Sequence, residues 1–341
     1  MRFVHLTLFL VLTPILGVIG CTGEGATRPK PSMASKQNSP TRPGDLREGS
    51  GSIGPDKPRF LRHELRLVAT WRMQPPLGER FDASGLLLLP DGRLLTVNDK
   101  GAQVCEILRA SPTGGIALLK PFPAFTAAQL RSIGGINKPY FDGEALAQDE
   151  MGRLYLAEEM DRWILRWNPM KNEIERLPID WAPVSKYFSK SDANASFEGL
   201  AVGGGKMFVA NERQVGRIIV VDLETLKVVD DFQVSPFGIE ARDVHYSDLC
   251  WYRDELWVLC RESRCVLRVD PVLKRVLEQL DYGRIELAPD NAYQSLIPAG
   301  FVEGLAVDAD SIWLAVDNNG VPRRADSSDS RPTLFRCERP R

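Results

Sequence analysis

The stretch FDGEALAQDEMGRLYLAEE, residues Phe141–Glu159, consists of two short apolar runs joined by a turn sequence at 149–152. Short apolar runs on either side of a glycine-containing turn predict a β-hairpin. Carboxylates stand at both open ends of this hairpin, and Glu144 and Glu158 are symmetric about Met151. Because residues at equal distances from a turn lie opposite each other, the hairpin brings acidic side chains from both strands to one end.

The same pattern recurs along the chain. Five stretches match it, and they begin about 50 to 60 residues apart, a period in the range of β-propeller blades. The stretches are Phe81–Lys100, Phe141–Glu159, Phe197–Arg213, Ser247–Ser263 and Phe301–Asn319. Aligned on the residue before the apolar run, they place a small or acidic residue at one position: Ser84, Glu144, Glu198, Asp248 and Glu303.

Two more strand-like runs follow most hairpins, for example RWILRWN and EIERLPI after the second. About four strands per unit, with weak helical periodicity, predict an all-β fold of the β-propeller type. We count five blades, and a sixth would have to lie in a longer insert such as 121–140. The last unit ends after one further run, 333–338, whereas a spare run, His63–Met73, precedes the first hairpin. We therefore expect this N-terminal strand to complete the last blade and close the ring.

The innermost hairpins should all open toward the same mouth of the ring. Carboxylates gathered in a partly dry channel raise one another's pKa values unless a cation or basic groups compensate. Oxygen-only ligands suit Ca²⁺ or Mg²⁺ rather than zinc, and calcium is the cofactor that we consider. The candidate metal ligands are Glu144, Glu198, Asp248 and Glu303.

A structural role for these acids is the alternative. Each acid would then cap its own turn or accept hydrogen bonds from backbone amides. Nearby arginines would neutralise the remaining charge: Arg162, Arg213, Arg242 and Arg261.

Three stretches also carry a family resemblance. DGEALAQDEMGRLYLAEEMDRWILRW, DLCWYRDELWVLCRESRCVLRVDPVLKRVLEQLDYG and FVEGLAVDADSIWLAVDNNG resemble hairpins of the SdiA-regulated (YjiK-like) periplasmic β-propellers. Similar glutamate-led hairpins occur in the esterase-like domain of some phytases and, more loosely, in calcium lactonases of the gluconolactonase and paraoxonase kind. The resemblance covers most of Phe81–Gly320 and implies a propeller more than an activity. The chain departs from the family pattern at Ser84, at Cys260-Arg261 and at Asp317-Asn318.

The N-terminus has the features of a bacterial lipoprotein signal. Residues 1–21 contain Arg2, a mostly apolar run and the ending Val18-Ile19-Gly20-Cys21, which resembles a lipobox. The resemblance implies acylation of Cys21 and hence an anchor in the membrane, with the protein in the cell envelope facing the periplasm or the exterior. A secretory signal with a chance cysteine is the alternative. Residues 22–60 predict a flexible tether, and residues 61–341 the propeller.

Charge and composition limit the kinds of binding partner that we expect. The chain has a formal net charge of −2 and no run of basic residues, so we expect no nucleic-acid partner. We expect a monomer with an unidentified small-molecule or protein ligand. Cys260 and Cys265 flank a turn and could face each other across adjacent strands. Because the cysteines lack zinc-site spacing, we expect buried free thiols.

Two function classes remain. One is a binding or scaffold module whose acidic mouth holds a divalent cation or a ligand. The other is a metal-dependent hydrolase of a lactone or a phosphoester, in which His245 is the candidate general base. A solvent-bonded loop histidine is the alternative for His245. The sequence contains no G-x-S-x-G, H-E-x-x-H or Walker motif, which favours the binding module.

Overall fold

A computed structural model describes residues 61–76, 79–133, 141–190, 195–213, 216–295 and 300–340. These residues belong to one compact unit, Asp56–Arg341. Cys21 and the predicted tether, 22–60, lie outside the described residues. Within the described ranges, no helix is long and apolar enough to span a membrane.

The described strands form four sheets, in which most neighbouring strands are antiparallel. Three of these sheets each contain one blade, whose four strands follow one another in chain order from the innermost to the outermost. Blade 2 contains β7 (Gly143–Gln148), β8 (Leu154–Glu158), β9 (Trp163–Asn168) and β10 (Glu173–Arg176). Blade 3 contains β11 (Phe197–Gly203), β12 (Lys206–Asn211), β13 (Arg217–Asp222) and β14 (Lys227–Phe232). Blade 4 contains β15 (Asp248–Tyr252), β16 (Glu255–Cys260), β17 (Cys265–Asp270) and β18 (Arg275–Asp281).

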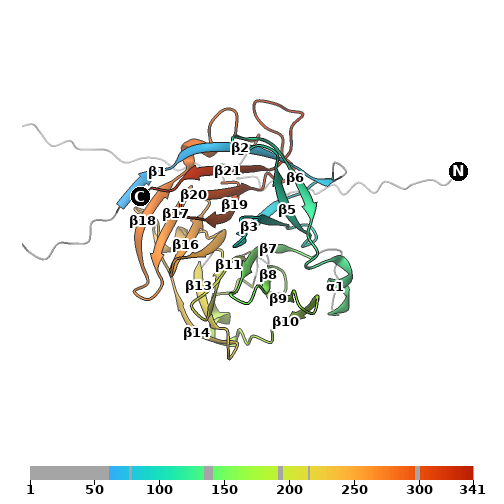
Figure 1. Cartoon of the computed structure of the whole chain (residues 1–341). Coiled ribbons are helices and arrows are strands. Elements are labelled where there is room, and N and C mark those ends of the chain that lie inside the picture. The colour runs from blue at the N-terminus through green and yellow to red at the C-terminus, as the bar shows by residue number, and fades with distance from the viewer. Residues whose placement is uncertain are drawn as a thin grey trace, which may run out of the picture. The chain divides into compact units, whose positions relative to one another are not determined.

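The fourth sheet has eight strands and joins the first blade to the last. Blade 1 contributes β3 (Ala83–Leu88), β4 (Leu94–Asn98), β5 (Val104–Arg109) and β6 (Gly115–Pro121). Blade 5 contributes β19 (Val302–Val307), β20 (Ser311–Val316), β21 (Thr333–Glu338) and the N-terminal strand β2 (Arg66–Gln74). Strand β2 pairs antiparallel with β21 and parallel with β6, and Figure 1 shows these ends of the chain side by side. The predicted all-β propeller with an N-terminal closing strand is confirmed.

One boundary of the closing strand differs from the prediction. His63 does not belong to it, because the strand is interrupted at Leu65. The preceding strand β1 (Leu61–Glu64), which contains His63, pairs parallel with β18 of blade 4. The amide of Leu65 donates to the carbonyl of Asp281, which fixes the change of direction. The N-terminal segment therefore extends one blade and completes the next.

Helical structure is minor among the described residues. The described part of the insert at 121–140 holds a short helix, α1 (Ala127–Ser132), rather than strands of a further blade. Thr126 caps this helix in a capping box with Gln129. The other short elements are α2 (Gly283–Glu286) and the 3₁₀ turns η2 (Ala182–Tyr187) and η3 (Ala241–Asp243).

The core lies between the blades. Buried apolar side chains form five clusters, and each cluster combines residues of two neighbouring blades around the ring. Trp71 of β2 stacks on Trp313 of β20 with ring centroids 5.9 Å apart, so the closing strand fills the core between blades 5 and 1. Burial of such large side chains contributes about 1.5–3 kcal/mol each.

Four of the five cysteines in the described residues are buried, as predicted, whereas Cys250 is half-buried. Cys260 and Cys265 are directly opposed on β16 and β17, and both are buried. All five cysteines of the described residues are free thiols.

Candidate functional site

A β-bulge at the start of the inner strands positions the acidic side chains. Register shifts in β7, β11 and β19 fall at Glu144, Glu198 and Glu303, whose neighbours on either side pair regularly with the next strand. A bulge places an extra residue in one strand and changes the direction of its side chain. In the structure these three acids are buried, with at most 6% of their surface exposed.

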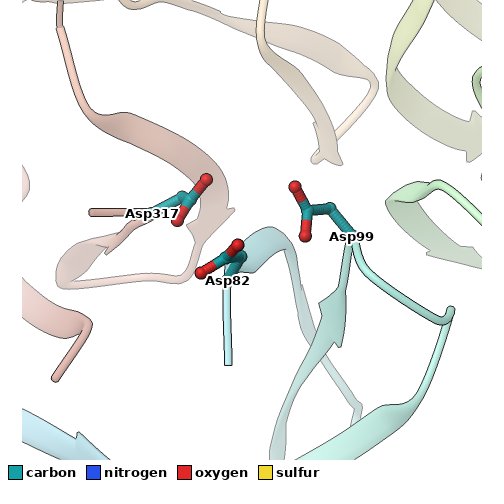
Figure 2. Close-up of side chains that lie close together, drawn as sticks. All are labelled: Asp82, Asp99 and Asp317. Atoms are coloured by element: carbon teal, nitrogen blue, oxygen red, sulfur yellow. The ribbon is translucent and has the colours of Figure 1, made fainter. Parts of the chain in front are cut away.

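Two groups of three carboxylates lie at this mouth. Oxygens of Asp82, Asp99 and Asp317 lie within 4.8 Å of one another, and so do oxygens of Asp99, Asp142 and Glu144. Asp99 is common to both groups. Figure 2 shows Asp82, Asp99 and Asp317 facing one another from three separate segments, just before β3, just after β4 and just after β20. We call the first group the aspartate triad.

The second group already contains a cation from the protein. The ammonium group of Lys100 lies 2.5 Å from Asp99 Oδ2 and 3.8 Å from Asp142 Oδ1. The aspartate triad shares this lysine through Asp99, and Arg80 binds Asp82 from one side. Asp99 Oδ1, however, is buried and accepts no hydrogen bond from any described residue. A buried acceptor without a donor is costly, so this oxygen is suited to a ligand.

The carboxylates perturb one another strongly. Burial, with Lys100 opposing it, raises the pKa of Asp99 to about 6. Burial raises the pKa of Glu303 to about 7 even though Arg261 lowers it. The pKa of Asp317 is raised well above its usual range, first by burial and then by Glu303 and Asp82. Burial and the charges of neighbouring acids thus raise pKa values in the mouth, as the clustering of carboxylates predicted.

Glu159 and Glu198 are both buried in the mouth. Burial and the charge of Asp142 raise the pKa of Glu159 to about 8. Burial, followed by the charges of Glu212 and Glu144, raises the pKa of Glu198 well above its usual range. Both groups therefore favour the protonated form more than an exposed glutamate does.

Arg261 neutralises the other side of the mouth. Its guanidinium donates to Glu303 and, at 2.7 Å, to Glu212. It thereby links blades 3, 4 and 5. Arg213 likewise binds Glu212. Arg242 was also predicted to neutralise the mouth, but it pairs with the exposed Glu240 instead.

Asp248 has the structural role that the sequence left open. Its Oδ2 accepts from the amides of Leu305, at 2.7 Å, and Leu86, at 3.2 Å, and its Oδ1 accepts from the amide of Leu249. These amides belong to the inner strands of blades 5, 1 and 4. A Cβ at Gly199 in blade 3 would lie 2.9 Å from Asp248 Cα, so the strands approach as closely as glycine permits. Asp248 therefore ties the inner strands together on the axis.

The four predicted metal ligands thus differ in position. Glu144 belongs to one of the three-carboxylate groups, whereas Glu198, Asp248 and Glu303 belong to neither of those found among the described residues. His245 Nδ1 lies 3.8 Å from Glu262 Oε1, also outside both groups. Metal binding by these acids and catalysis by His245 stay predictions.

Sequence reasoning left out two residues of the groups. Asp82 and Asp142 follow phenylalanine at the start of the first two hairpins, and this Phe-Asp repeat was the available signal. Asp99 and Asp317 lie at the far end of their hairpins, where symmetry about the turn predicted polar groups.

Comparisons with known proteins agree with this architecture. The family model "Phytase-like: Esterase-like activity of phytase" matches residues 81–320. Among solved structures, glutaminyl cyclase from Myxococcus xanthus is similar with a TM-score of 0.54 and 15% identity, over 82% of this chain and 97% of that chain. An aldose sugar dehydrogenase from Streptomyces coelicolor gives a TM-score of 0.43 and 12% identity, over 80% of this chain and 96% of that chain.

At such identities the likeness to the cyclase concerns the fold alone. A comparison with curated protein sequences gave no match. The family match confirms the resemblance to phytase esterase-like domains, while the resemblance to SdiA-regulated propellers stays a prediction. The match covers most of the chain and includes every hairpin, and the chain belongs to the phytase-like family of esterase-like domains.

Proposed function

We propose that the protein is a phosphoester hydrolase that depends on a divalent cation held by the aspartate triad. The observation that carries this proposal is the triad itself, in which three carboxylates are buried and Asp99 Oδ1 accepts no hydrogen bond from any described residue. Membership of the phytase-like esterase family supports the choice of a phosphoester over other substrates.

The residues present fit a hard cation. Asp82, Asp99 and Asp317 offer only oxygen atoms, the donors that Ca²⁺ and Mg²⁺ prefer. A bound cation would also offset the repulsion that, together with burial, raises the pKa values of Asp99 and Asp317. When bound, the cation would supply positive charge against which a phosphoryl oxygen is polarised.

The chain's own residues would supply the proton transfer and the positioning. Glu159 and Glu198, whose pKa values are raised by burial and neighbouring charges, are suited to deliver a proton to a leaving oxygen or to take one from water. Lys100 stands between Asp99 and Asp142 as a fixed positive charge and would reduce the repulsion of an anionic substrate. Arg261 would keep Glu212 and Glu303 in place.

The location belongs to the proposal as well. The lipobox-like ending at Cys21 supports a lipid-anchored protein of the cell envelope. Changing Cys21→Ser should release the protein from the membrane fraction and leave the melting temperature of the propeller unchanged. Continued tight membrane association of that variant would contradict the anchor.

A binding module that holds the cation without catalysis is the second candidate. The lack of a nucleophile motif in the sequence favours it. The two candidates differ in turnover, not in cation binding.

An activity assay of chelator-treated protein separates them. The substrates are 4-nitrophenyl phosphate, its diester and a simple lactone, each with Ca²⁺, Mg²⁺ or no cation. We expect cation-dependent phosphoester turnover that falls roughly 100-fold in Asp99→Asn. Asp91→Asn, at an exposed turn paired with Arg93, is the matched control and should retain activity. Cation binding without turnover of any substrate would establish the binding module instead.

A further inference from the structure

A cavity of about 1360 Å³ lies at the end of the propeller axis opposite the carboxylates. Its wall is built from the ends of the inner strands and the hairpin turns that follow them, whereas the acidic groups lie at the starts of these strands. Leu86, Leu200 and Leu249 form part of its floor. The amides of Leu86 and Leu249 donate to Asp248, so Asp248 lies between the cavity and the acidic mouth.

Two guanidinium groups stand on one wall of this cavity. Arg109, at the end of β5, lies over the ring of Trp313 with Cζ 4.5 Å from the centroid, and Arg336 of β21 lies 5.3 Å from the same centroid. The Arg109 guanidinium makes no ion pair and no hydrogen bond with any described residue. Arg336 donates to the neutral hydroxyl of Ser311.

Asp308 acts on Arg109 through its charge but forms no ion pair with Arg109 or Arg336. Asp308 accepts at Oδ1 from the amides of Asp310 and Ser311 and at Oδ2 from Trp313 Nε1, 2.9 Å away. Both oxygens of Asp308 thus accept hydrogen bonds within its own turn. Burial and the charge of Arg336 lower the pKa of Arg109 and outweigh the opposing charge of Asp308.

The acids of the remaining walls belong to other blades. Asp149 is bonded to Arg153 and Tyr155, Asp222 accepts from the amide and the hydroxyl of Thr225, and Glu150 and Glu224 lie at exposed turns. Apolar side chains, chiefly leucines, and a few polar ones such as Gln148 and Lys206 complete the lining. Trp251 stacks on Phe208 with ring centroids 5.4 Å apart and borders the cavity.

We propose that this cavity is a second binding site, for an organic anion with an apolar body, whose anionic group is bound by Arg109 and Arg336. Guanidinium groups bind carboxylates and phosphates through charge-assisted hydrogen bonds, and both groups lie here over the ring of Trp313. The leucines and Trp251 contact the apolar body. The volume is ample for a small organic ligand, since such sites measure about 300–1,000 Å³.

Calorimetric titration of the full chain in EDTA tests this site without a cation at the other end. The probes are hexanoate, hexyl phosphate, hexanol and inorganic phosphate. We expect at least one of the two organic anions to bind about tenfold more tightly than hexanol and than inorganic phosphate. The anion that binds identifies the head group as carboxylate or phosphate. Equal affinity for hexanol, or no binding of either organic anion, would overturn the proposal.

Two variants locate the binding. Arg109→Met and Arg336→Met keep an unbranched stem over Trp313 and should each weaken anion binding about tenfold. Arg176→Met is the matched control, because Arg176 lies over Trp163 in blade 2, with Cζ 4.7 Å from the ring centroid, and does not border the cavity.

An equal loss in Arg176→Met would contradict the site. So would loss of binding in Asp99→Asn, which would place the anion at the acidic mouth. If an arginine variant does not fold, the comparison of the organic anions with hexanol on the native chain still decides.

Discussion

The two ends of the propeller axis are built from the same five hairpins but have opposite chemistry. At the strand starts, bulges and flanking residues collect carboxylates such as Glu144 and Asp99. At the strand ends, the turns border a cavity with two unpaired arginines, Arg109 and Arg336. Asp248 lies between the two ends and bonds to the backbone of several blades. A repeated unit can thus present two different surfaces, because the repeat fixes the backbone while single side chains decide each end.

The largest effect on stability should come from opening the ring, because the surfaces at both ends of the axis depend on a closed ring. Deletion of Arg66–Gln74 removes β2, the strand that pairs with both β21 and β6. It would leave two open sheet edges and expose the core around Trp71, so we expect loss of cooperative unfolding. Circular dichroism melting provides the measurement.

Deletion of Leu61–Glu64 is the control for that experiment. It removes β1, which only extends blade 4 at its outer edge. We expect a modest drop in melting temperature. If both deletions melt alike, β2 does not close the ring.

The next comparison makes the same change, from carboxylate to amide, at Asp248 on the axis and at Glu198 in the acidic mouth. Asp248→Asn replaces an acceptor of backbone amides with a group that is partly a donor, so it should destabilise the protein by about 1–3 kcal/mol. Glu198→Gln removes one of several repelling carboxylates and should be neutral or slightly stabilising in chelator. Urea unfolding of the two variants measures both. Effects of the same sign would show that the two acids have the same role.

Stability in chelator should depend on pH with a defined sign. Burial and neighbouring charge raise the folded-state pKa of Glu159 to about 8, and burial raises that of Glu303 to about 7. In the unfolded chain a glutamate titrates near about 4.3. Between these values the folded state binds more protons than the unfolded state, so the free energy of unfolding falls as pH rises.

Melting temperatures from pH 5 to 9 measure this dependence. From the titration of Glu159 and Glu303, we expect the chelator-treated protein to melt several degrees lower at pH 9 than at pH 5. A saturating cation should flatten the curve. A melting temperature that rises from pH 6 to 8 in chelator would contradict the repulsion within the mouth.

The sequence predicted the fold and one end of the axis better than the other. The hairpin period and the spare N-terminal run predicted the closed propeller, because both depend on local patterns. The acids at the strand starts were visible because they recur at one position in the repeat. Asp248 belongs to that same position, yet it bonds backbone amides, because it is the one acid there whose strand carries no bulge.

The rest depended on contacts between blades. The aspartate triad combines residues far apart in sequence, Asp82 and Asp317, through closure of the ring. Arg109 and Arg336 lie on third strands, outside the repeated hairpin, so alignment of the hairpins gave no signal for them. No local pattern encodes such a meeting of side chains.

A calcium titration of the chelator-treated protein, followed by melting, tests the central claim most directly. A cation that binds only the folded state raises its melting temperature by mass action. We predict a concentration-dependent rise for the native chain and for Asp91→Asn, and loss of that rise in Asp99→Asn. Magnesium is titrated in parallel, since the triad's oxygens suit either ion. If neither ion raises the melting temperature of the native chain, or if Asp99→Asn responds as the native chain does, the aspartate triad is not a cation site.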